Sequence, residues 1–191
     1  AGRARHGHRR EVERGQEREV RRSEPSARVD HPIAGRHVGP SPPHVLVEAD
    51  RALAEFDVVL TVGGVSVGDH DWVPRALAGI GATTAFHKVA LRPGKPLLVA
   101  SRGRSVMLGL PGNPVSAQVT FRLFAAPLLR AWQGHASPEP RRARVVVAEP
   151  VLHERGRLEL VRARHDHASG MVVPLANQSS GSVRAMADAD W

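Results

Sequence analysis

Two loops of this 191-residue chain, one rich in glycine and one containing glycine and two prolines, carry residue types that suit the binding of an anion. They are residues 63–71, GGVSVGDHD, and residues 110–117, LPGNPVSA. Each precedes a predicted helix; glycine lets the backbone approach a ligand closely, and the free amides of a helix N-terminus favour negative charge. The glycine spacing of residues 63–71 matches neither the dinucleotide fingerprint nor the P-loop, so a plain strand-to-helix connection is the alternative.

A third loop, residues 87–96, has the sequence HKVALRPGKP. Its cations Lys88, Arg92 and Lys95 stand near prolines that fix the backbone, so the loop would present positive charge and lose little entropy on binding. The chain has 27 basic residues, and its only two lysines both lie in this loop. This bias favours a site for a phosphate or a small oxyanion over the alternative, a solvated basic turn.

Alternating helices and apolar strands must position these loops. The residue patterns predict helices over residues 44–55, 72–77 and 113–132, and strands over residues 56–62, 85–90, 97–100 and 105–110. Such alternation is typical of an α/β fold with a largely parallel sheet, and open α/β sheets bind ligands beyond the carboxyl ends of their strands. We therefore expect the three loops to face one electropositive cleft.

The chain divides by composition into three parts. Residues 1–43 contain ten Arg, six acidic residues and no Leu or aromatic residue, which predicts a disordered or non-native segment. Residues 44–135 form the predicted α/β domain. Beyond a linker at residues 134–142, short apolar runs predict a small β domain over residues 136–191, with strands at residues 144–152, 158–164 and 171–175.

Several classes of function are disfavoured by what the sequence lacks. The absence of cysteine excludes a disulfide scaffold and a cysteine nucleophile, and it agrees with a cytoplasmic location. There is no secretory signal, no apolar run near the ~20 residues of a membrane span, and no serine-hydrolase or zincin motif. The net charge of +8 does not favour nucleic-acid binding, because acidic residues interleave the arginines of residues 1–43. The His-Asp-His sequence at residues 165–167 could ligate a metal, but such a pair of histidines is more often a polar turn.

Three segments resemble, closely and in order, the molybdopterin molybdenumtransferase family of the MoeA type, which includes the gephyrin E domain. They are DVVLTVGGVSVGDHDWV, FHKVALRPGKPLLVA and LGLPGNPVSAQVTFRLFAAPLL, with weaker likeness in ELVRAR and NQSSGSVRAMADAD. The resemblance covers about residues 44–191. It implies a three-layer α/β molybdopterin-binding domain with a largely parallel sheet whose first strand is missing, followed by a small, truncated C-terminal β domain.

The resemblance also implies an activity and a set of site residues. The family inserts molybdate into adenylylated molybdopterin with release of AMP and the assistance of Mg²⁺, as a cytoplasmic homodimer without a membrane partner. By position, Asp71 and Lys88 match catalytic residues, and Asp71 also matches a metal ligand. The implied substrate-binding set is Gly63, Gly64, Ser66, Gly68, Pro111, Gly112, Asn113, Pro114 and Ser116. The implied molybdate-binding set is Arg92, Lys95, Pro96, Arg162 and Ser180, with Arg92 where the family usually has lysine and hence a planar fork in place of a point charge.

Family members carry two further domains before these segments, so we expect the chain to be a fragment with an unrelated head that ends before the last strand of its β domain. Three alternatives to the transferase remain. One is a non-catalytic molybdopterin-binding module. Another is the related molybdopterin adenylyltransferase, which the PGKP and LPGNP loops disfavour. The last is an Arg-rich nucleic-acid binder that acts through residues 1–43.

Overall fold

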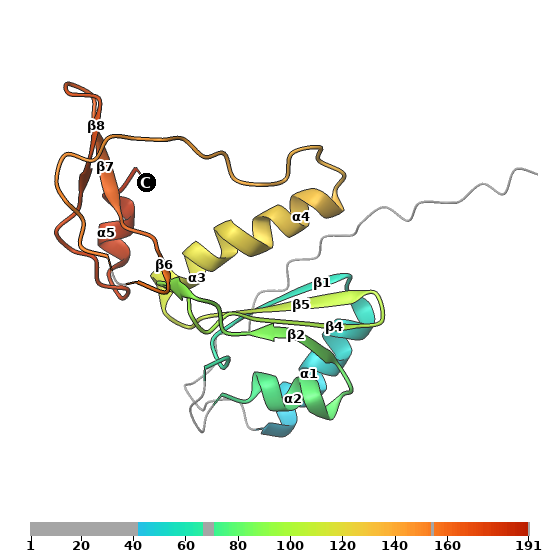
Figure 1. Ribbon diagram of the computed structural model, residues 1–191. Helices are drawn as coiled ribbons and strands as arrows, with labels where there is room; N and C mark the ends of the chain where they lie inside the picture. The colour runs from blue at the N-terminus through green and yellow to red at the C-terminus, as the bar shows by residue number, and fades with distance from the viewer. Residues whose placement is uncertain (1–41, 67–70, 154, 191) are drawn as a thin grey trace, which may run out of the picture. The chain divides into compact units, whose positions relative to one another are not determined.

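The computed structural model of the chain describes residues 42–66, 71–153 and 155–190 (Figure 1). Its elements are α1 (Pro42–Glu55), β1 (Val58–Val62), α2 (Val73–Gly79), β2 (Thr83–His87), β3 (Leu91–Arg92), β4 (Leu98–Arg102), β5 (Ser105–Leu110), α3 (Pro114–Thr120), η1 (Phe121–Ala125), α4 (Ala126–Trp132), β6 (Leu158–Glu159), β7 (Ala163–Asp166), β8 (Met171–Pro174) and α5 (Val183–Ala187). The segment predicted as disordered or non-native, residues 1–43, lies outside the described residues except for its last two, which begin α1.

Four strands form the central sheet in the order β1-β5-β4-β2. β1 pairs with β5 in parallel, whereas β4 is antiparallel to both of its neighbours. The pairing of β4 with β5 follows from their connection, because Gly103 and Arg104 form a two-residue loop, which joins antiparallel strands. The predicted α/β class is confirmed, and the sheet is mixed, with its parallel pair at β1 and β5.

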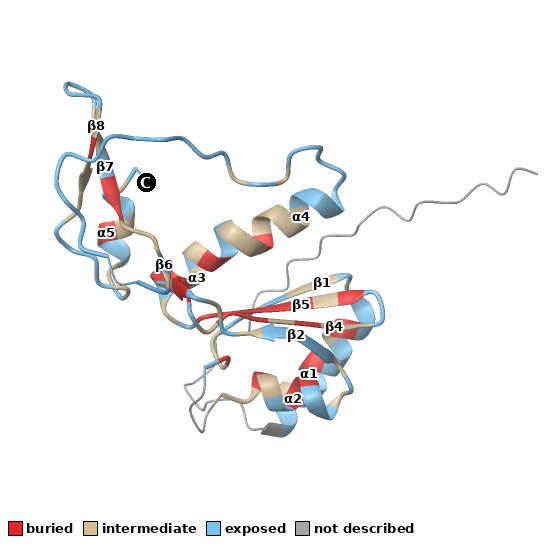
Figure 2. Cartoon of the chain, in the orientation of Figure 1, coloured by how far each residue is buried: buried red, intermediate tan, exposed pale blue. Residues whose placement is uncertain are grey.

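Helices cover both faces of this sheet and give the three expected layers, as the buried residues in Figure 2 show. Side chains alternate between the faces along a strand. Met107 of β5 packs with Leu53 of α1 and Leu77 of α2 on one face. Leu108 and Leu110 face the other way and pack with side chains of η1 and α4. The two apolar clusters hold the sheet between α1 and α2 on one side and the α3–α4 helix on the other.

The helix that follows β5 spans the predicted residues 113–132 but changes its winding in the middle. α3 passes into η1, a π-helical turn over Phe121–Ala125, and then into α4. The cause is Pro127, which has no N–H to donate to the preceding turn and whose ring crowds the carbonyl four residues earlier. A π turn ahead of the proline accommodates both effects without ending the helix.

β1 is an edge strand, and among the described residues its one neighbouring strand is β5. The apolar run at residues 56–62 predicts a strand buried on both faces, and this prediction is wrong. Leu60 and Val62 are exposed, and the other three strand residues are half-buried. An apolar run is common to central strands and to edge strands that face another element, so composition alone does not separate them.

The C-terminal part of the chain is built on the β7–β8 hairpin, whose register pairs Ala163 with Pro174 and Asp166 with Met171. A hydrogen bond from the Ser169 hydroxyl, with one from the Ala168 amide, holds the pKa of Asp166 below its usual range. The linker at residues 134–142 contains no helix or strand, as predicted. The predicted strand at residues 144–152 is wrong, because Val147 makes only an isolated bridge to Val172. α5 was not predicted.

No helix of the described residues is long and apolar enough to cross a membrane. All the described residues belong to one compact unit. The division into domains at residues 44–135 and 136–191 stays a prediction.

The core between the sheet and α1–α2 predicts the effect of truncating a central side chain. Leu98 is fully buried, so Leu98→Ala should lower the free energy of unfolding by about 2–5 kcal/mol through lost burial and an unfilled cavity. The matched control is Leu152→Ala, because Leu152 is 96% exposed and should change stability by about 0.5 kcal/mol or less. Chemical denaturation followed by circular dichroism measures both; equal effects would contradict the described core.

Candidate functional site

The strand register brings the three predicted loops to one end of the sheet, where the carboxyl ends of β1, β5 and β2 meet the start of β4 (Figure 1). Val62, the last residue of β1, lies opposite Leu110, the last residue of β5. Leu98, the first residue of β4, lies opposite Gly109 on one side and opposite His87, the last residue of β2, on the other. The described segments that join these strands to the predicted loops, residues 63–66, 88–97 and 111–113, therefore start or end where these strand ends meet.

Two of the loops touch through glycine. The amide of Gly63 donates to the carbonyl of Leu110 over 2.9 Å. A Cβ added at Gly112 would lie 3.3 Å from the Cα of Gly63, and Gly63 has a φ of +88°, which L side chains rarely adopt. Glycine at both positions is what allows the backbones to approach so closely. The loops predicted to hold the pterin and its phosphate are thus in contact.

His87 joins the loop after β1 to the end of β2. Its Nε2–H donates to the carbonyl of Val65 over 2.6 Å, and the side chain of Val65 is buried in the core. This contact fixes residues 63–66 of the first loop relative to the loop at residues 87–96, which we call the basic loop. His87 carries no role in the sequence analysis, although it stands directly before Lys88.

Backbone hydrogen bonds join the two ends of the basic loop, and its cationic side chains are exposed. The amide of Lys88 donates to the carbonyl of Leu97 over 2.8 Å, and that of Val89 donates to the carbonyl of Lys95 over 2.9 Å. Lys88 has a φ of +73°, a strained value for a residue with a side chain. The side chains of Lys88, Arg92 and Lys95 are exposed, so the loop presents three positive charges to solvent.

Gly94 locks this loop against α3. Its φ is +121°, and a Cβ added there would lie 2.8 Å from the Cγ2 of Thr120 and 3.1 Å from the Cδ2 of Leu91. Thr120 is itself buried, and its hydroxyl donates to the carbonyl of Ser116. The PGKP sequence therefore packs on the helix whose first turn carries Ser116, so two of the predicted loops share one support.

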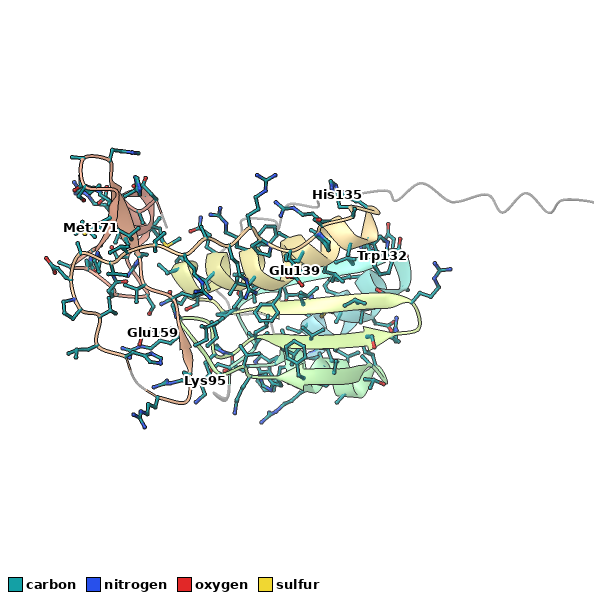
Figure 3. The ribbon with its side chains drawn as sticks, turned by 45° about the horizontal axis from the view of Figure 1, so that its top comes forward. Lys95, Trp132, His135, Glu139, Glu159 and Met171 are labelled. Carbon is teal, nitrogen blue, oxygen red and sulfur yellow. The ribbon has the colours of Figure 1, made fainter. Side chains whose placement is uncertain are left out.

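The C-terminal part reaches the basic loop through β6, which pairs with β3 in parallel. The amide of Leu158 donates to the carbonyl of Ala90, and that of Leu160 to the carbonyl of Arg92, both over 2.8 Å. Between them, the Glu159 carboxylate lies 3.4 Å from the Arg92 guanidinium. Its second oxygen lies 3.6 Å from Nδ1 of His153. Glu159 and Lys95 are labelled in Figure 3. Glu159 places a negative charge at the predicted anion site, and the sequence analysis did not identify this residue.

The Arg162 guanidinium is buried and bonded to backbone carbonyls, so it does not face solvent as a molybdate ligand would. Arg162 is 6% exposed, and its guanidinium donates to the carbonyl of Ser179 over 3.0 Å and to that of Ser182 over 3.3 Å. Its backbone is paired with the side chain of Gln178. In this arrangement Arg162 holds the turn at residues 179–182 in position.

The turn at residues 179–182 places Ser180 beside Asn113, at the start of α3. The side-chain amide of Asn113 donates to the Ser180 hydroxyl over 3.2 Å. Asn113 is the N-cap residue of α3, but its side chain makes no capping hydrogen bond, and its Oδ1 is buried without a hydrogen-bond partner. The predicted pterin loop and the predicted molybdate-binding serine are therefore in direct contact, beside an acceptor that no described group satisfies.

The remaining predicted residues have mixed positions. Pro111 and Ser116 are buried, Gly64, Pro96 and Asp71 are half-buried, and Ser66 and Pro114 are exposed. Gly68 lies outside the described residues. Among the residues that the structure describes, no group of three or more His, Cys, Asp or Glu side chains could hold a metal ion. Asp71 is the described carboxylate at the end of the first loop.

A cavity of about 300 Å³ lies beside the first turn of α3. It is lined by Leu110, Pro114, Val115, Ala117, Gln118, Phe121, Val183 and Met186. The lining is mainly apolar, whereas we expected an electropositive cleft. The cations of the basic loop contribute nothing to this cavity, and of the predicted site residues only Pro114 does.

Two family models match the chain. Residues 31–131 match a model described as a probable molybdopterin binding domain, and residues 144–190 match one described as the MoeA C-terminal region, domain IV. The fold and its loops thus define an α/β domain of the molybdopterin-binding class. Since the first model matches more than half of the chain, the chain belongs to that family.

Curated relatives give the comparison more detail. The molybdopterin molybdenumtransferase of Bacillus subtilis (strain 168) is 35% identical over 142 residues, which are 73% of this chain and 33% of the relative. The same-named protein of Nostoc sp. is 38% identical over 152 residues, or 70% of this chain and 35% of the relative. The resemblance to this transferase family is confirmed, and the chain spans about a third of the length of these relatives.

A solved structure agrees on the fold. The molybdopterin biosynthesis MoeA protein from Pyrococcus horikosii superposes with a TM-score of 0.57 at 23% sequence identity. The superposition covers 77% of this chain and 34% of that protein. At this identity the likeness supports the α/β architecture alone.

The buried position of Arg162 predicts a structural effect of its removal. Arg162→Ala would remove the guanidinium donor from the carbonyls of Ser179 and Ser182, of which the Ser179 carbonyl keeps the Ser182 amide, and it should lower the free energy of unfolding by about 2–4 kcal/mol. Arg164→Ala is the control, since Arg164 is exposed and it contacts Asp188 at the surface, through a hydrogen bond to the carbonyl and a 3.9 Å ion pair that together are worth about 1 kcal/mol or less. Thermal unfolding of both variants decides; equal stability would show that Arg162 does not hold the turn.

Proposed function

We propose that this chain forms the molybdopterin- and molybdate-binding part of an enzyme that inserts molybdate into adenylylated molybdopterin and releases AMP. The observation that carries the proposal is that the three loops meet at one end of the sheet and that the basic loop exposes its cations there. The shared name of the curated relatives supports the reaction class. In the intact enzyme the site would work in a cytoplasmic homodimer.

The exposed cations suit molybdate, which is a tetrahedral dianion. Arg92 and Lys95 would supply charge-assisted hydrogen bonds to its oxygens. Ser180 would add a hydroxyl donor: because its oxygen accepts a hydrogen bond from Asn113, its own proton is free to point at the anion. Arg162 would act on molybdate through Ser180, by fixing the turn that carries this serine.

The touching glycine loops suit the pterin and its phosphate. The close contact of Gly63 with Gly112 leaves no side chain between the two backbones, and a helix N-terminus favours negative charge, so a phosphate would bind near the start of α3. The buried Oδ1 of Asn113 lacks a partner, so it would accept a hydrogen bond from a ring N–H or amino group of the pterin. Pro111, Pro114 and Ser116 would shape this end of the site.

Asp71 and Lys88 are the residues proposed for the chemical step. Asp71 lies half-buried two residues before the start of α2, at the end of the first loop. Mg²⁺ is commonly bound by one or two carboxylates together with substrate phosphates and waters, so a single described carboxylate fits this ion. When bound, the ion would neutralise phosphate charge during the release of AMP. Lys88 would hold the departing phosphate from the opposite loop.

Removal of a cation from the basic loop should weaken the binding of molybdate. Lys95→Ala deletes one charge-assisted hydrogen bond, which corresponds to about a tenfold or greater loss of affinity. Isothermal titration calorimetry with molybdate measures it. The control is Arg104→Ala, which removes a positive charge from the β4–β5 loop at the opposite end of the sheet and should leave the affinity unchanged. An equal loss in both variants would point to net charge alone and overturn the site.

The Glu159 carboxylate predicts an opposite effect. It repels an incoming dianion and engages Arg92, so Glu159→Gln should tighten molybdate binding severalfold, and added salt should shrink the gain. Glu149→Gln is the control, because Glu149 is an exposed carboxylate in the segment between α4 and β6. Weaker binding by Glu159→Gln would contradict the repulsion and assign Glu159 to holding Arg92 in place.

A non-catalytic molybdopterin-binding module is the second candidate, since the family model that matches residues 31–131 is described by molybdopterin binding and not by a reaction. Both candidates bind the pterin, but only an enzyme releases AMP in a molybdate-dependent way. The assay combines the chain with adenylylated molybdopterin, molybdate and Mg²⁺ and measures AMP. Release that is lost in Asp71→Asn supports the transferase, and binding without release supports the module.

A further inference from the structure

The β7–β8 hairpin carries two histidines that the proposed function does not use. His165 is in β7 and His167 is in the turn that follows. The turn is well fixed: the Asp166 carboxylate accepts hydrogen bonds from the Ala168 amide and the Ser169 hydroxyl, and the Gly170 amide donates to the Asp166 carbonyl. The backbone between the two imidazoles is therefore held in one conformation.

The two rings meet through the same type of atom. Nδ1 of His165 lies 3.1 Å from Nδ1 of His167, with the ring centroids 4.6 Å apart and the planes at 70°. If the two nitrogens pointed straight at each other over 3.1 Å, the ring centroids would lie about 5.4 Å apart. If their lone pairs were parallel and side by side, the centroids would lie only about 3.1 Å apart. The observed separation lies between these limits, and it is the separation expected when both nitrogens face a common position beside the two rings.

That position suits a metal ion. With metal–nitrogen bonds of about 2.0–2.1 Å, two nitrogens 3.1 Å apart subtend roughly 98° at the metal, between the square-planar and tetrahedral angles. Two rings aimed at such an ion would have their centroids about 4.8 Å apart, close to the 4.6 Å observed. Binding would need only small ring movements, because the spacing of the donors is already that of a chelate.

We propose that His165 and His167 form a two-histidine chelate site for a borderline divalent cation of the Cu²⁺ or Zn²⁺ kind. Imidazole donors without thiolate or carboxylate partners select this class over Mg²⁺ or Ca²⁺. Each ring would bind through Nδ1 and keep its proton on Nε2, so the neutral rings release no proton. Waters would complete the coordination. The Asp190 carboxylate, which accepts a hydrogen bond from the His165 amide over 3.0 Å, adds nearby negative charge.

The alternative is a polar turn in which one imidazole donates to the other. An N–H···N hydrogen bond accounts for the 3.1 Å distance, but it requires no affinity for a metal. Metal titration therefore separates the two. His167 is exposed, so His167→Ala should fold normally, and thermal unfolding without metal checks that it does.

The test titrates Cu²⁺ and, separately, Zn²⁺ into the full chain and into His167→Ala. We expect one site per chain in the wild type, with a Cu²⁺ electron paramagnetic resonance spectrum showing two nitrogen ligands. His167→Ala should lose at least tenfold in affinity. Zn²⁺ should shift the Nδ1 resonances of both histidines in ¹⁵N spectra, a change that a merely structural hydrogen bond would not produce.

The matched control is the double variant His6→Ala and His8→Ala, because His6 and His8 have the same spacing in the sequence. This variant should keep the hairpin site. No binding by the wild type, unchanged binding by His167→Ala, or loss of the site in the double variant would each overturn the proposal. The test does not involve molybdopterin or molybdate, so its outcome is independent of the proposed function.

Discussion

The register of β4 is the constraint on which the candidate site depends. Leu98 lies opposite Gly109 on β5 and His87 on β2, and the parallel β1–β5 pair places Val62 opposite Leu110. Because these four strand ends coincide, loops far apart in sequence meet. A shift of β4 by one residue would also move Leu98 out of the cluster it forms with α1 and α2 and onto the face covered by α3–α4, so the same apolar packing that stabilises the sheet fixes the position of the basic loop.

Much of the α/β part could be predicted from sequence, because its elements have strong apolar periods and clear end signals. β5 has the predicted bounds, and the long helix after Asn113 begins at the expected proline. The C-terminal part could be predicted less well. Residues 144–152 have the composition of a strand, but a strand also needs neighbours, and only Val147 has a bridge. α5 is five residues long, too short for a helical period to be read.

The same limit applies to the site. Motif order predicts which loops matter, but it does not distinguish a side chain that faces a ligand from one that supports a loop. Arg162 shows this, because its acceptors are the backbone carbonyls of Ser179 and Ser182, which no residue-type pattern encodes. Glu159 was missed because its significance comes from a pairing of β3 with β6 across more than sixty residues. The apolar cavity beside α3 was missed for the same reason: distant segments form its walls.

The exposed side chains of β1 affect how the purified chain would behave. Leu60 and Val62 stand on a strand that has one neighbour among the described residues. A strand edge with free amides and carbonyls can add another strand, and apolar side chains on it make that addition favourable. Within the described part of the chain this edge would favour edge-to-edge association, and a charged substitution at the exposed Val62 would oppose it.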